Sequence, residues 1–133
     1  MREHDEKRKF PRVKINNLLS YICIDENNGE ADHGVGRALD ISQVGLLLES
    51  RAPIESEKIL LTTVTEQNEL LDIKGRVAYC REAEPKIFTT GVQFLENKER
   101  IRQIVVNMIR IYNLEKNGMK TNSCKVFMTD QLS

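Results

Sequence analysis

The stretch LLDIKGRVAYCR, residues 70–81, decides the fold class. Apolar and polar residues alternate loosely along it, which favours a strand with one buried face. Gly75 lies in its middle, and a glycine inside a strand indicates a bulge or a bend at the corner of a barrel. A second such glycine, Gly91, lies in the following stretch, residues 87–95. The two glycines predict strands that bend enough for a sheet to close on itself.

Four further β-rich stretches precede residues 70–81, and clusters of turn formers separate them. The six expected strands cover residues 13–24, 35–39, 44–49, 58–64, 70–81 and 87–95. The turns lie at residues 25–29, 40–43, 66–68 and 82–85, with a polar connection around Pro53. Six short strands at near-regular spacing suit a closed sheet better than an open one, whose edges would be exposed. We therefore predict a mainly β fold, a six-stranded antiparallel β-barrel.

After residue 96 the apolar pattern changes to the spacing of a helix. Asn97 is the expected N-cap, and Gly118 is placed to end the helix. Its apolar stripe consists of Ile101, Ile104, Val105, Met108, Ile109 and Tyr112. Val106, Ile111 and Leu114 lie outside this stripe, which is more apolar surface than packing one face on a barrel requires. We attribute the excess to a homodimer contact through this C-terminal helix.

Length and charge limit what the chain can be. Its 133 residues, 40% of them hydrophobic, can bury one core but are too few for two ordinary domains. We expect an N-terminal arm over residues 1–12, the barrel and helix over residues 13–117, and a tail over residues 118–133. The formal net charge is zero and 5% of the residues are aromatic, which argues against nucleic acid as a partner. No apolar run reaches the roughly 18 residues of a membrane span, so we expect no span and a cytoplasmic address.

The cysteines do not predict a metal site or a disulfide framework. Cys23, Cys80 and Cys124 are far apart, no Cys-x-x-Cys pair is present, and the chain has two histidines. Cys23 and Cys80 lie within apolar runs. We expect both to be small core residues in a reducing compartment.

Other side chains that could carry chemistry are expected to be structural. Tyr79 and Phe94 are expected in the core. His33 is expected in a loop. Ser42 has no histidine near it in the sequence, so no nucleophile and base pair is visible and we expect no catalysis.

A basic motif, Arg8-Lys9-Phe10-Pro11-Arg12, precedes the first expected strand. Its two arginines are four residues apart, and Pro11 keeps the residue before it extended. A guanidinium is a planar fork of donors that can grip a phosphate, or the O6 and N7 edge of guanine, in two places. Arg8 and Arg12 are therefore candidate anion-binding residues, with Lys7 and Lys9 as possible additional contacts.

A second motif, Asp40-Ile41-Ser42-Gln43-Val44-Gly45, lies between two expected strands. Asp40 can accept hydrogen bonds from the N–H groups of a guanine, and Ser42 can donate to a phosphate or a base. Gly45 lets a ligand or another strand approach the backbone closely. Each motif alone is common, because Asp-x-Ser-x-x-Gly is also an ordinary turn.

Together and in this order, the two motifs resemble those of the PilZ domain family, over about residues 7–115. Arg8 and Arg12 match its Arg-x-x-x-Arg, and Asp40, Ser42 and Gly45 match its Asp/Asn-x-Ser-x-x-Gly. Residues 74–77 and 91–94 also look like its closing strands. The resemblance implies a bacterial receptor for the second messenger cyclic di-GMP, with a six-stranded split barrel, a C-terminal helix and no cofactor.

The resemblance also implies how such a receptor works. An arginine-bearing arm folds over cyclic di-GMP on the barrel surface, and a downstream protein reads the change. We expect the arm before Val13 to be mobile without the ligand and ordered with it, because its polar composition offers little to bury. The alternative is a PilZ-like adaptor that acts by protein contact, with weak or no nucleotide binding.

Overall fold

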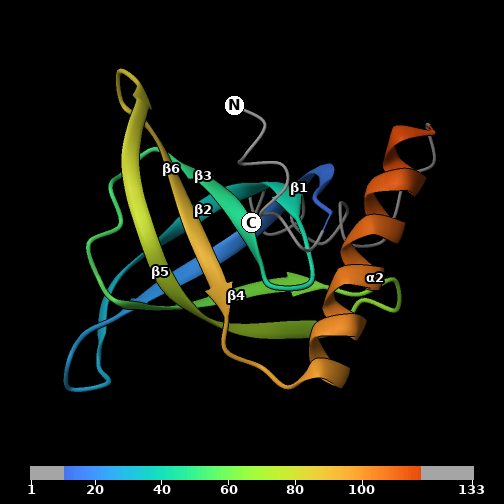
Figure 1. Cartoon of the computed structure of the whole chain (residues 1–133), viewed down its shortest axis with the longest axis horizontal. Helices are drawn as coiled ribbons and strands as arrows, with labels where there is room; N and C mark the ends of the chain where they lie inside the picture. The colour runs from blue at the N-terminus through green and yellow to red at the C-terminus, as the bar shows by residue number, and fades with distance from the viewer. Residues whose placement is uncertain (1–10, 118–133) are drawn as a thin grey trace.

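The computed structural model describes residues 11–117, which form six strands and one helix. The strands are β1 (Val13–Ile24), β2 (Glu30–Ile41), β3 (Gly45–Ser50), β4 (Lys58–Val64), β5 (Leu70–Glu84) and β6 (Ile87–Phe94), and the helix is α2 (Lys98–Lys116). Figure 1 shows the strands curving around one another and α2 lying to one side. The mainly β prediction with a C-terminal helix is confirmed.

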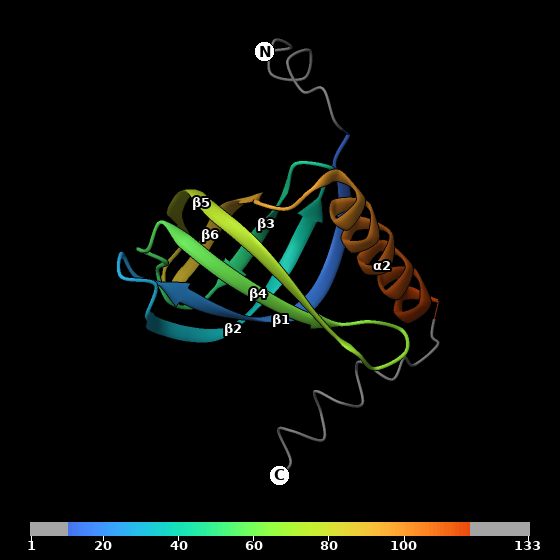
Figure 2. The ribbon, with the colours of Figure 1, turned by 90° about the horizontal axis from the view of Figure 1, so that it is seen from below.

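The sheet closes into a barrel in the order β1-β2-β3-β6-β5-β4. Every neighbouring pair is antiparallel, and β4 returns to pair with β1 along residues 58–62. Figure 2 shows this ring of strands from a second side. Because the ring is closed, it has no free sheet edge. The absence of exposed edges is the reason for which a closed sheet was predicted from six short strands.

Most strand boundaries agree with those predicted, and two strands are longer. β1 and β4 have the predicted ends, whereas β2 already begins at Glu30 and β5 continues to Glu84. His33 therefore lies in β2, opposite Ile22, and its prediction as a loop residue is wrong. The polar residues at 82–84, which suggested a turn, pair with β6 instead. The β5–β6 turn therefore consists of two residues, and Lys86 within it has a φ of 66°.

Gly75 does not form a bulge. It pairs regularly with Ile59 on one side and Phe94 on the other. The register shifts of β5 against β6 lie between Val77 and Tyr79 and near the hairpin end of the two strands. Gly75 is needed for packing instead, because a Cβ there would overlap the side chain of Val92.

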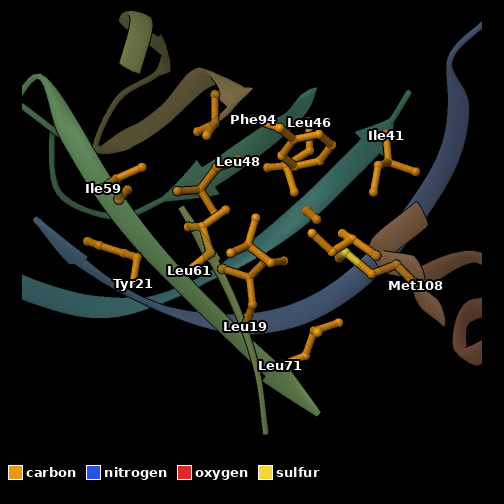
Figure 3. Packing of buried hydrophobic residues seen from close by; sticks show 14 of the residues in the cluster. Leu19, Tyr21, Ile41, Leu46, Leu48, Ile59, Leu61, Leu71, Phe94 and Met108 are labelled. Carbon is orange, nitrogen blue, oxygen red and sulfur yellow. The ribbon is translucent and has the colours of Figure 1, made fainter. Parts of the chain in front are cut away.

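Large aliphatic side chains fill the barrel interior. Leu19, Leu48 and Leu61 are fully buried and point into the same space from three strands (Figure 3). Ile104 and Met108 extend this cluster from the helix. Phe94 and Cys23 are buried and Cys80 packs against the cluster, as predicted, while Cys124 lies outside the described residues. Burial raises the pKa of the Cys23 thiol, which keeps it protonated as a core residue.

Helix α2 begins where the sequence predicts. The side chain of Asn97 accepts a hydrogen bond from the Arg100 N–H at 2.8 Å, which confirms it as the N-cap. The helix ends at Lys116 with Asn117 as its C-cap, and Gly118 lies outside the described residues. Ile111 is buried, so its prediction as surplus apolar surface is wrong.

A buried asparagine joins the helix to the barrel. Asn17 Nδ2 donates a hydrogen bond of 2.9 Å to the backbone oxygen of Met108. Asn17 lies between the buried residues Ile15 and Leu19 in the regular alternation of β1, which turns its amide inward. Asn16 is exposed beside it. β1 and α2 are therefore fixed to each other by a polar contact as well as by apolar packing.

We expect Asn17→Asp to destabilise the fold by about 3 kcal/mol or more at neutral pH. A carboxylate oxygen would face the Met108 oxygen in a buried place, and burial would raise the pKa of the new carboxyl above its ordinary value of about 3.9. The neutral acid can donate to that oxygen. The deficit in unfolding free energy should therefore be smallest below pH 4 and grow as pH rises through the folded-state pKa.

Urea denaturation of wild type and Asn17→Asp between pH 4 and pH 8 measures this. Asn16→Asp is the control, because its side chain is exposed and should change the unfolding free energy by less than about 0.5 kcal/mol. Equal stability of the two variants across this range would contradict the assigned contact.

Candidate functional site

An open pocket of about 230 Å³ lies on the outer wall of the barrel where β2 turns into β3. Arg12, Asp40, Ser42 and Gly45 line it, so the structure brings together the parts of the two motifs that it describes. Arg8, Lys7 and Lys9 lie outside the described residues. The wall opposite the turn comes from β5 and β6, at residues 78–79 and 91–93.

Strand pairing places Arg12 in this pocket. Val13, the first residue of β1, pairs with Ile41 near the end of β2, so the residue before it comes level with the β2–β3 turn. Arg12 Nη1 lies 3.8 Å from Asp40 Oδ2, with side-chain exposures of 44% and 19%. A long pair with an exposed arginine contributes at most about 1 kcal/mol, so a ligand can replace it at small cost.

Ser42 is buried at the turn. Its Oγ accepts a hydrogen bond from the Val44 N–H at 3.2 Å, and its own N–H donates to the Gly45 oxygen at 2.9 Å. The hydroxyl proton is not used in the bond to Val44. Ser42 therefore holds the turn in shape and keeps a donor at the pocket.

Gly45 is required by the neighbouring strand. A Cβ at this position would overlap the carbonyl oxygen of Val92 on β6. Gly45 pairs with Gln93, so it lies at the start of the β3–β6 ladder. The sequence left open whether Gly45 allows close approach of a ligand or of another strand. The structure shows close approach of another strand, β6.

Tyr79 is a pocket residue that the sequence reasoning missed. Its prediction as a core residue is wrong, because 42% of its surface is exposed and it lines the pocket. The register shift between Val77 and Tyr79 interrupts the alternation of β5, so Ala78 and Tyr79 are both exposed. Residues 77–80 are four consecutive apolar residues, and this run was the sequence signal that apolar and polar residues do not alternate strictly in this part of β5.

A larger hollow of about 870 Å³ lies elsewhere and has a different character. Asp25, Asp32, Glu55 and Glu57 are among its lining residues, with Lys58 as its cation. Such a lining disfavours a phosphate. Within residues 11–117, no group of histidine, cysteine, aspartate or glutamate side chains could hold a metal ion. The pocket at the β2–β3 turn is therefore the candidate site.

A family model for the PilZ domain matches residues 6–110 of the chain. The chain belongs to the PilZ domain family. The match spans both motifs, all six strands and most of α2. No curated protein sequence matches the chain significantly.

Several solved structures share the fold of this one. The complex of K. pneumoniae MrkH with c-di-GMP is 16% identical, with a TM-score of 0.55, over 77% of this chain and 52% of that one. The Bacillus subtilis inhibitor of motility MotI/DgrA is 12% identical, with a TM-score of 0.55, over 78% and 50%. The chain thus spans about half the length of these two proteins. The PilZ domain of Escherichia coli YcgR with c-di-GMP is 15% identical, with a TM-score of 0.55, over 84% and 98%.

We expect Gly45→Ala to destabilise this PilZ domain in the absence of any ligand. The methyl group would push β6 away from the start of β3, and overpacking of this kind costs about 1–3 kcal/mol. Guanidinium denaturation of the ligand-free protein measures the loss. Gly29→Ala is the matched control, because the nearest atom to its added methyl group is Asp25 Oδ2 at 3.2 Å, a contact that a shift of a few tenths of an ångström relieves. Equal stability of both variants would show that β6 does not require a glycine here.

Proposed function

We propose that the chain is a receptor for cyclic di-GMP, with Arg8, Arg12, Asp40, Ser42 and Gly45 forming its binding site. One observation carries the proposal. In a PilZ domain, Arg12 of the first motif lines one pocket with Asp40, Ser42 and Gly45 of the second, and Arg12 Nη1 lies 3.8 Å from Asp40 Oδ2. Two of the structures similar in fold, those of MrkH and of the YcgR PilZ domain, contain c-di-GMP.

The chemistry of the pocket suits a dinucleotide with two phosphates and two guanines. The Arg12 guanidinium can grip a phosphate or a guanine edge, and Asp40 can accept from the guanine N–H groups. Ser42 adds a donor at the turn. The ligand would replace the Arg12–Asp40 ion pair with stronger charge-assisted contacts to both partners.

Arg8 would cover the ligand from the arm. Four residues of extended chain span at most roughly 14 Å, so Arg8 can reach across the pocket that Arg12 lines. We propose that residues 1–12 act as this arm, that 13–117 form the receptor domain and that 118–133 are a separate tail. Lys7 and Lys9 are additional candidate contacts of the arm.

The receptor signals by changing its surface. Closure of the arm over the nucleotide alters one face of the barrel, and a downstream protein that prefers the closed form shifts the equilibrium further. We propose a binding protein without catalysis and without a cofactor, because Ser42 Oγ accepts a hydrogen bond within its own turn and no histidine is among the described residues that line its pocket. Within residues 11–117, no helix is long and apolar enough to cross a membrane. The free thiols of Cys23 and Cys80 support a cytoplasmic address.

Arginine substitutions test the site. We expect Arg12→Ala and Arg8→Ala each to weaken cyclic di-GMP binding by roughly 10-fold to 150-fold, because each removes a hydrogen bond to a charged group worth about 1.5–3 kcal/mol. Isothermal titration calorimetry measures the affinity and the molar ratio together. Arg102→Ala is the control, because this exposed arginine lies on α2 and does not line the pocket. Wild-type affinity in both motif variants would overturn the site, and no binding by wild type would leave the adaptor alternative.

The homodimer is a further proposal. Val106 on α2 is 45% exposed, and it lines a hollow on the helix together with Ile109 and Leu114. Apolar surface gathered in this way favours association. We propose that two copies meet through this face of α2.

We expect wild type to sediment as a dimer at high micromolar concentration and Val106→Glu to sediment as a monomer, because a buried carboxylate opposes the contact. Analytical ultracentrifugation measures the change. Val35→Glu is the control, since Val35 is even more accessible, at 55%, but lies on β2. A monomeric wild type at these concentrations would refute the dimer.

A further inference from the structure

Tyr79 is the aromatic side chain that stands out on the described surface. Among residues 11–117, it is the sole aromatic residue in the set of exposed large apolar side chains. The other members of that set are aliphatic: Val13, Val35, Val44, Leu70, Leu95 and Val106. An exposed aromatic ring at the wall of a binding pocket offers a flat surface to a ligand base.

Two local features of the sheet hold this ring in place. The register shift between Val77 and Tyr79 directs the side chain outward. Gly91 lies opposite on β6, and one edge of the ring covers it so closely that a Cβ there would overlap the ring. A glycine in a strand commonly gives this kind of room to an aromatic neighbour. The ring is thereby placed across β6 and faces the pocket that Gly45 and Arg12 line.

An arginine lies near the ring, although it is not among the residues that line the pocket. The Cζ atom of Arg81 lies 5.6 Å from the centroid of the Tyr79 ring, and the Arg81 side chain is exposed. A planar guanidinium can stack on a base as well as on an aromatic ring. A base between the two needs a separation of roughly 7 Å, twice a contact distance of ~3.5 Å. Arg81 would therefore move outward by about 1 to 2 Å to admit one.

We propose that Tyr79 and Arg81 bind one guanine base of the ligand between the ring and the guanidinium. This inference rests on the proposed function and adds a third element to it. Arg12 and Asp40 supply charge and hydrogen bonds on one side of the pocket, and β5 supplies a stacking surface on the other. Stacking does not read the edge of a base, so Tyr79 contributes affinity and position, while Asp40 supplies the preference for guanine.

The primary test is calorimetric titration with cyclic di-GMP. Tyr79→Ala should weaken binding by roughly 5-fold to 150-fold, the range for loss of one base–aromatic stack. Tyr79→Phe should recover most of this loss, because the ring remains. Arg81→Gln should weaken binding to a smaller extent. Val35→Ala, an exposed apolar truncation away from the pocket, should leave the affinity at its wild-type value.

Gly91→Ala moves the ring without removing it. The three atoms nearest to the added methyl group all belong to the Tyr79 side chain, which can swing away. We expect Gly91→Ala to weaken binding about as much as Tyr79→Ala. In the Tyr79→Ala background nothing remains to be displaced, so Gly91→Ala should then have no further effect. This non-additivity distinguishes ring placement from general damage to the sheet.

Fluorescence gives a readout at the ring itself. The chain has no tryptophan, so Tyr79→Trp introduces a single one. Stacking of guanine on it should quench its emission in a saturable way, with the same Kd as calorimetry. Lys116 and Tyr112 on α2 form a matched cation–ring pair, at 5.9 Å, outside the pocket. Lys116→Gln should therefore bind like wild type, in contrast to Arg81→Gln.

The outcomes separate the two proposals. If wild type binds cyclic di-GMP and Tyr79→Ala and Gly91→Ala bind equally well, the stacking site is overturned and the receptor stands. If wild type binds but Arg81→Gln does not differ from Lys116→Gln, the guanidinium half of the proposal fails. If wild type does not bind the dinucleotide, the receptor function fails and the stacking site fails with it.

Discussion

The antiparallel pairing of Val13 with Ile41 is the constraint on which the candidate site depends. It fixes the point where the chain enters the barrel beside the point where β2 turns into β3. Arg12 and Asp40, distant in sequence, come within 3.8 Å of each other as a result. A slip of one residue would turn every β1 side chain to the opposite face and would move Arg12 away from the turn. The buried residues Ile15 and Leu19 oppose such a slip, so the core and the site specify the same register.

The sequence predicted the barrel because its signals were local. Turn formers at residues 25–29 and 66–68 mark hairpins, and Asn28 and Asn68 do take positive φ values there. The N-cap at Asn97 was also predictable from its local sequence. The lengths of β2 and β5 could not be predicted in this way. Asp32, His33 and Glu84 are polar, which argued against strands, but they pair with neighbouring strands and so belong to β2 and β5. Burial of Ile111 likewise depends on how α2 lies against the barrel, which helical spacing alone does not determine.

The site was predictable in part for the same reason. The residues at the β2–β3 turn act within a few positions of one another, so their pattern could be read directly. Tyr79 could not be placed, because a register shift against β6 decides which way it points. Apolar character at residues 77–80 favours the core until that irregularity is known. The role of Gly91 could not be predicted either, because it depends on the Tyr79 ring that covers this glycine in the folded structure.

The packing of the interior explains why a ligand site lies on the outer wall. Six strands enclose a narrow barrel, and Leu19, Leu48 and Leu61 leave no exposed surface inside it (Figure 3). A dinucleotide cannot enter such a core. It must lie against strands that present one face to water, where a flat wall alone gives few contacts. Under the proposed function, binding there requires side chains from outside the wall, and an arginine-bearing segment placed directly before β1 can supply them.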